Sequence, residues 1–77
     1  MTDSRGNNLQ VGDYVQKQPP INRQVWMLTY DRSKYKVMSI NDIEIVLCPV
    51  IDDKTITVER IFHTQKSMNF YGLVKIK

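Results

Sequence analysis

Short runs of strand-forming residues, broken every few positions by turn residues, constrain the fold of this chain more than any other feature. Runs rich in Val, Ile, Tyr and Thr alternate with polar breaks from residue 23 onward. No window carries the apolar i, i+3, i+4, i+7 spacing of an amphipathic helix. The pattern predicts an all-β chain with hairpins turning near residues 31–34 and 52–54, and at most one short helical turn near residues 64–68.

The length and composition predict a single small domain spanning residues 1–77. The chain has 77 residues, of which 42% are hydrophobic and 25% are charged. Five or six short strands in a chain of this length favour a meander that curls into a small open barrel, preceded by a polar N-terminal arm over residues 1–8. The chain has no apolar run of membrane-spanning length, no secretory signal pattern and one cysteine. These features predict a cytoplasmic protein.

The second half of the chain contains the clearest predicted hairpin. Residues 43–51 carry a single charge and are apolar on both faces, which predicts a central strand. Residues 55–62 follow the tight turn at residues 52–54. Their alternation predicts that Ile56 and Val58 face the core.

The opening residues carry a separate signal. In Asp3-Ser4-Arg5-Gly6-Asn7-x-Leu9-x-Val11-Gly12-Asp13-x-Val15, turn residues lead into a short apolar alternation. Gly12 can adopt a positive φ and Asp13 can bond its own backbone, so we expect a tight turn or bulge before the first strand. The run resembles the start of small Src-homology-3-like or KOW-like barrel proteins of tailed bacteriophages. The resemblance implies a small barrel of phage origin, and it ends after Val15.

A basic, tyrosine-containing segment is the best candidate for binding nucleic acid. The formal net charge of +3 permits an anionic partner without requiring one. Between residues 30 and 36, aromatic side chains alternate with cations: Tyr30, Arg32, Lys34, Tyr35 and Lys36. Rings can stack bases while cations neutralise phosphates, although the same residues also fit a cross-strand tyrosine pair around a solvated turn.

The only tryptophan suggests a protein-binding surface. Trp26, Leu28 and Tyr30 would share one side of a strand that is apolar on both sides. In so small a barrel we expect one side to remain exposed as a contact surface, with Arg32 and Lys34 as a basic rim; the alternative is that both sides are covered. With the phage resemblance, this predicts an accessory protein that binds a host protein. The alternatives are a small nucleic-acid-binding module and a virion or assembly component that self-associates through an exposed sheet edge.

The remaining polar side chains do not form a catalytic or metal-binding pattern. His63 and Cys48 are the only soft metal ligands and lack ligand spacing, so we interpret His63 as a surface or loop residue and Cys48 as a small buried hydrophobe. Adjacent Asp52 and Asp53 fit a plain hairpin turn. The sequence therefore predicts a protein without enzymatic activity, metal or cofactor.

Overall fold

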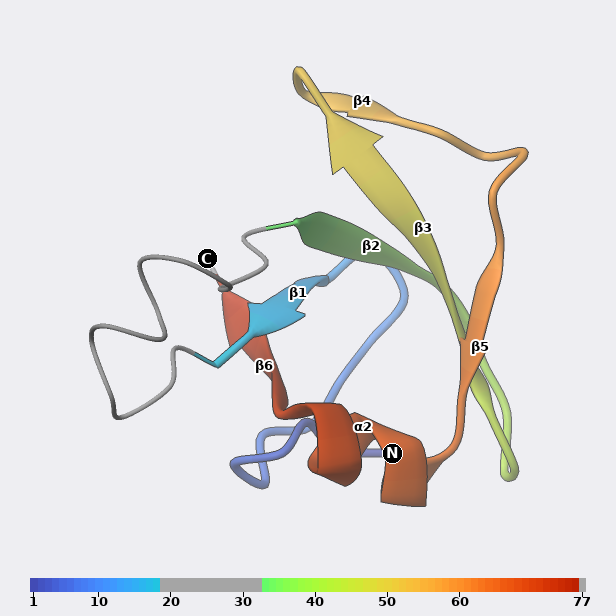
Figure 1. Ribbon diagram of the computed structural model, residues 1–77. Helices are drawn as coiled ribbons and strands as arrows, with labels where there is room; N and C mark the ends of the chain where they lie inside the picture. Colours follow the sequence, from blue (N-terminus) through green and yellow to red (C-terminus); the bar gives the residue numbers. More distant parts are fainter. Residues whose placement is uncertain (19–32, 77) are drawn as a thin grey trace.

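The computed structural model describes residues 1–18 and 33–76, which fold as one antiparallel sheet and one short helix (Figure 1). In chain order the elements are β1 (Tyr14–Lys17), β2 (Lys34–Ile40), β3 (Ile45–Ile51), β4 (Lys54–Thr55), β5 (Ile61–His63), α2 (Gln65–Tyr71) and β6 (Leu73–Ile76). The strands lie in the order β4-β3-β2-β1-β6, and β5 pairs with the other end of β3. The sheet curls without closing, which confirms the predicted all-β open barrel.

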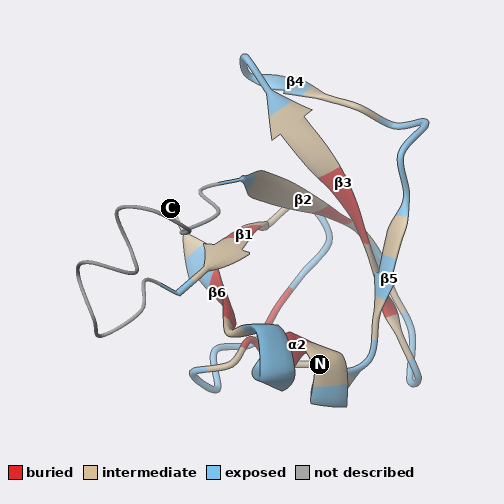
Figure 2. Ribbon diagram, in the orientation of Figure 1, coloured by how far each residue is buried: buried red, intermediate tan, exposed pale blue. Residues whose placement is uncertain are grey.

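The core lies on the inner face of the curled sheet and includes one residue of α2. Figure 2 marks the buried positions along the strands and the helix. Strand pairing places Val37 opposite Leu47 on this face. A register shift at Met38 then allows Ile40 to pack against the same core three residues later. The buried cluster consists of Leu9, Val15, Val37, Ile45, Leu47, Met68 and Leu73.

Strand β3 is central, as its two apolar faces predict, because β2 lies on one side of it and β4 and β5 lie on the other. The predicted turn at residues 52–54 is also present, and it connects the paired residues Ile51 and Lys54. Cys48 in this strand is buried, as expected.

The predicted strand over residues 55–62 is wrong, and Pro49 explains why. Pro49 accepts a hydrogen bond of 2.8 Å from the Ile56 N–H, but proline has no N–H to return to the Ile56 carbonyl. That carbonyl instead accepts from the Glu59 N–H and closes a turn. The chain leaves the sheet until β5, and Val58, predicted to face the core, is 89% exposed.

The predicted helical turn near residues 64–68 is a longer helix, α2, which has seven residues. Thr64 and Ser67 form a reciprocal capping box at its start, and Gly72 ends it in the left-handed conformation with φ 65°. Met68 anchors the helix in the core. In the described part of the chain, no helix is long and apolar enough to cross a membrane.

Residues 1–8, expected as a polar arm, instead form a closed loop packed against β6 and α2. The Ser4 N–H donates to the Leu73 carbonyl at 2.8 Å. The side-chain amide of Gln65 forms two hydrogen bonds with the backbone of Thr2, as a neighbouring strand would. The amide oxygen accepts from the Thr2 N–H and the amide nitrogen donates to the Thr2 carbonyl, each at 2.9 Å. The loop therefore joins the helix to part of the outer edge of β6.

The predicted turn before the first strand is confirmed. Gly12 has a φ of 98°, and the Asp13 carboxylate accepts the Gln10 N–H at 2.8 Å. The Gly12 N–H donates to the Val37 carbonyl, and the Val37 N–H donates to the Asp13 carbonyl. These residues of the opening run therefore serve the fold, because they attach the start of β1 to β2.

Candidate functional site

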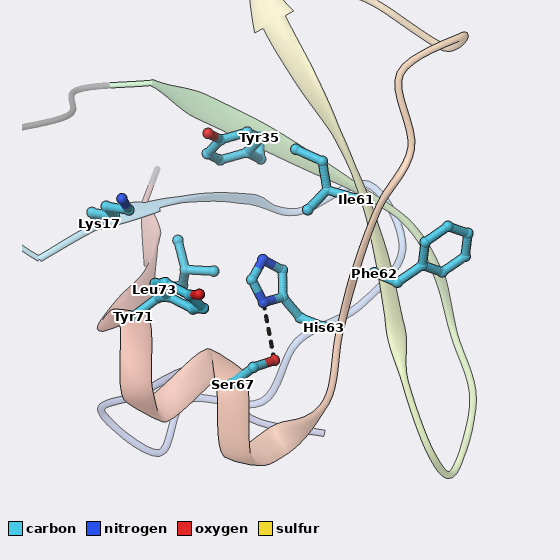
Figure 3. Close-up of a pocket in the computed structure, with 8 residues that line it drawn as sticks. All are labelled: Lys17, Tyr35, Ile61, Phe62, His63, Ser67, Tyr71 and Leu73. Atoms are coloured by element: carbon cyan, nitrogen blue, oxygen red, sulfur yellow. Dashed lines mark hydrogen bonds between the residues drawn. The ribbon is translucent and has the colours of Figure 1, made fainter.

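A cleft of about 510 Å³ opens on the inner face of the sheet (Figure 3). It lies between β5 on one side and the ends of β1 and β6 on the other, with α2 along its floor. Its lining residues are Lys17, Tyr35, Ile61, Phe62, His63, Ser67, Tyr71 and Leu73. The volume suits a small ligand or a few side chains of a partner.

Strand pairing brings the two walls of the cleft onto one face. Lys17 pairs with Leu73 across β1 and β6, and β5 places Ile61 and His63 on the inner face because they pair with core residues of β3. The intervening Phe62 points away from the cleft (Figure 3). All three residues of the short β5 strand therefore line the cleft, and the side chains of Ile61 and His63 point into it.

His63 lies at the end of β5, half-buried, and its second ring nitrogen faces the cleft while Nδ1 lies 3.0 Å from Ser67 Oγ (Figure 3). Burial lowers the pKa of the His63 imidazole below its ordinary value of 6.5, and the charge of Lys17 lowers this pKa further. The imidazole is therefore neutral near pH 7. His63 was interpreted from the sequence as a surface or loop residue; it lies in a strand and not in a loop, and it is only partly exposed where it lines the cleft.

Ser67 beside His63 belongs to the helix cap. Its Oγ accepts the Thr64 N–H at 2.8 Å and lies 3.1 Å from the Thr64 carbonyl, to which it can donate. A nucleophilic serine needs a hydroxyl that is free to turn toward a substrate and give its proton to the base. The Ser67 hydroxyl is already engaged in the capping hydrogen bonds, so it is not free to act as a nucleophile. The contact between His63 and Ser67 instead holds β5 against the start of α2.

Three rings in contact run from solvent into the cleft, and we call them the aromatic row: Phe70, Tyr71 and His63. The ring centroids of Phe70 and Tyr71 lie 5.1 Å apart, and those of Tyr71 and His63 lie 5.6 Å apart, both edge to face. Phe70 is 81% exposed and Tyr71 is 49% exposed. The Lys17 ammonium lies 5.8 Å from the Tyr71 centroid, which adds a positive charge at the mouth of the cleft.

A second cluster lies on the outer face of the sheet and consists of Tyr14, Lys34 and Lys36; we call it the lysine pair face. The ammonium groups of Lys34 and Lys36 lie 5.8 Å and 6.0 Å from the centroid of the Tyr14 ring. Register supports the arrangement, because Tyr14 pairs directly with Lys36 across β1 and β2.

The structure separates the residues of the basic segment identified from the sequence. Lys34 and Lys36 lie on the outer face, whereas Tyr35 between them lines the cleft. The other expected binding residues lie outside the described part of the chain: Trp26, Leu28, Tyr30 and Arg32.

The cleft was not predicted from the sequence, and neither was the contact of Lys34 and Lys36 with the Tyr14 ring. The alternation Ile61-Phe62-His63 indicates which residues share a face, but the cleft also needs Lys17 and Tyr71 from distant elements. Within residues 1–18 and 33–76, no cluster of three or more His, Cys, Asp or Glu side chains could hold a metal ion.

Comparison of the chain with protein-family models gave no match, and the curated proteins and solved structures gave no significant match either. The geometry of the two faces is therefore the basis for assigning a function.

Proposed function

We propose that this protein is a non-enzymatic accessory factor that binds a partner protein through the cleft and the aromatic row. The observation that carries the proposal is the aromatic row, which joins an exposed ring on α2 to a ring inside the cleft. Exposed aromatic side chains at the mouth of a concave site are typical of protein-binding anchors.

The chemistry of the lining favours a short apolar or aromatic segment of the partner. Ile61 and Leu73 offer apolar contacts, and Tyr35 and Tyr71 offer ring faces. The neutral imidazole of His63 can form a hydrogen bond with a polar group that enters the cleft. The cleft therefore combines an apolar lining with a few polar groups that could orient the segment, as binding pockets usually do.

We infer the biological context from the run over residues 3–15, which resembles the start of Src-homology-3-like barrel proteins of tailed phages. This resemblance supports a bacterial host protein as the partner and the host cytoplasm as the location. A virion or assembly role would use an exposed sheet edge. The N-terminal loop hydrogen-bonds to Leu73 and Lys75 along the edge of β6, which favours the accessory role over self-association there.

Paired surface variants test the proposal. Phe70→Ala with Tyr71→Ala removes the exposed part of the aromatic row, whereas Val58→Ala with Ile43→Ala removes apolar side chains that are 89% and 77% exposed elsewhere. Dichroism checks that both variants fold. We expect affinity capture from a nuclease-treated bacterial lysate to yield a protein retained by the unmodified chain and by the Val58 and Ile43 control.

Binding of the purified partner is then measured by titration calorimetry. The Phe70 and Tyr71 variant should bind at least about tenfold more weakly, because truncating an aromatic side chain that is a binding hot spot costs about 2 kcal/mol or more. Unchanged affinity in this variant, or an equal loss in the control, would refute the cleft as the binding site.

A further inference from the structure

We infer that the lysine pair face is a second binding site, which takes the phosphate backbone of single-stranded nucleic acid. The site is independent of the cleft because it lies on the opposite face of the sheet. Successive residues of a strand point to opposite faces, so Lys34 and Lys36 lie outward and Tyr35 lies inward. Tyr14 pairs with Lys36 and shares the outer face with both lysines.

The lysine pair face carries two positive charges close together on one strand. Within residues 1–18 and 33–76, neither ammonium has a carboxylate within ion-pair distance. The nearest cross-strand neighbours of the two lysines on β3 are Cys48 and Val50, which are uncharged. Such a pair of ammonium groups attracts a polyanion and gains free energy by releasing its counterions.

Tyr14 also restricts the positions of the two lysine side chains. An exposed lysine normally loses side-chain entropy when it binds an anion. Here both ammonium groups lie about 6 Å from one ring centroid, so cation–π attraction already restricts them. Part of the entropic cost of binding is therefore met before the ligand arrives, which raises affinity.

The surroundings of the lysines favour a single strand over other polyanions. Ile76 pairs with Tyr14, and Val50 pairs with Lys34, so half-buried apolar side chains flank the cations. A single-stranded nucleic acid alternates phosphates with flat bases that can lie on such a surface. An acidic peptide would satisfy the charges and leave the apolar flanks unused. A duplex keeps its bases stacked inside and would use only the charges.

Fluorescence anisotropy with a labelled oligodeoxythymidine of about 20 nucleotides tests the site. The test variant is Lys34→Ala with Lys36→Ala. The matched control, Lys54→Ala with Lys66→Ala, removes two exposed lysines and lowers the net charge of +3 by the same amount. We expect the test variant to bind at least about tenfold more weakly and to reduce the slope of log K against log salt by about 1.4, which corresponds to two lost phosphate contacts. The control should change little.

Tyr14 variants and competitors distinguish a built site from general charge attraction. Tyr14→Phe should keep the affinity, because the ring remains, and Tyr14→Leu should weaken it several-fold. Polyglutamate and a duplex should compete less well than the unlabelled single strand. The inference fails if the unmodified protein does not bind at about 50 mM salt, if both lysine doubles lose equal affinity, or if polyglutamate competes equally. Binding that depends on Phe70 and Tyr71 instead would assign the nucleic acid to the cleft.

Discussion

The carboxylate of Asp3 accepts a hydrogen bond of 2.7 Å from the backbone N–H of Lys75, 72 positions later in the chain. Asp3 is 1% exposed, and its two oxygens also accept from the Arg5 N–H and from the backbone and side chain of Asn7. One buried carboxylate thus closes the N-terminal loop and covers a donor on the edge of β6. Altering a buried polar group that makes all its hydrogen bonds destabilises the fold, because its partners are left buried and unpaired.

Replacing Asp3 with Asn should destabilise the fold by about 1–3 kcal/mol, because the new NH₂ group would face donors where an oxygen now accepts. The midpoint of urea unfolding at pH 7 measures the effect. Asp42→Asn, at an exposed position, is the matched control and should leave the midpoint nearly unchanged. Equal midpoints for the two variants would contradict the role of Asp3.

Acid should remove the contribution of Asp3. Burial raises the pKa of its carboxyl, but hydrogen bonds, led by those from the Lys75 N–H and Asn7, outweigh burial, and the pKa lies below its ordinary value of 3.8. The stabilisation is therefore complete above the unfolded-state pKa and is lost as the pH falls through the lower folded-state pKa. The difference in unfolding free energy between the unmodified protein and Asp3→Asn should shrink below about pH 4. A difference that is constant down to pH 2 would be evidence against this linkage.

His63, the only histidine, should titrate below its ordinary pKa of 6.5 in an NMR experiment. Lys17→Gln should raise the midpoint without restoring it fully, because burial is the larger cause. Since the folded-state pKa is the lower one, the neutral imidazole contributes stability above pH 6.5 that is lost as the pH falls through the folded value. A midpoint above 6.5 in the folded protein would show that the ring is not held in the cleft.

Val58→Ala should change the unfolding free energy by less than about 0.5 kcal/mol, since this side chain is 89% exposed. Leu47→Ala, at a fully buried position, should cost about 2–5 kcal/mol. Urea midpoints compare the two directly. A large loss of unfolding free energy in Val58→Ala would contradict the exposed position of Val58 and support the continuous strand predicted over residues 55–62.

Asp53→Gly should stabilise the hairpin between β3 and β4 by about 0.5 kcal/mol, because Asp52 and Asp53 have φ of 51° and 64° and glycine adopts positive φ without strain. Lys54→Gly serves as the control, since it places glycine in β4 and should destabilise. Thermal unfolding followed by dichroism measures both, and a lower midpoint for Asp53→Gly would argue against a left-handed turn.

Local features of the sequence were sufficient to predict the all-β class, the central strand around Cys48 and the turns at Gly12 and residues 52–54. Period-two alternation and positive-φ turn residues are properties of adjacent positions, so they can be recognised without a fold. The early end of β4, after Thr55, was harder to predict from the sequence. Pro49 is visible in the sequence, but its effect depends on which neighbouring strand its missing N–H would have faced.

Tertiary structure alone decided the cleft, the lysine pair face and the covered edge of β6. Lys17, His63 and Tyr71 come from three elements, and only the pairing of β1 with β6 and of β3 with β5 brings them together. Asp3 is buried at a place where its carboxylate accepts a hydrogen bond from an N–H 72 positions away. Each residue's type determined what chemistry it could contribute. The register and the curl of the sheet determined which residues met, because those depend on the free energy of the whole packed core.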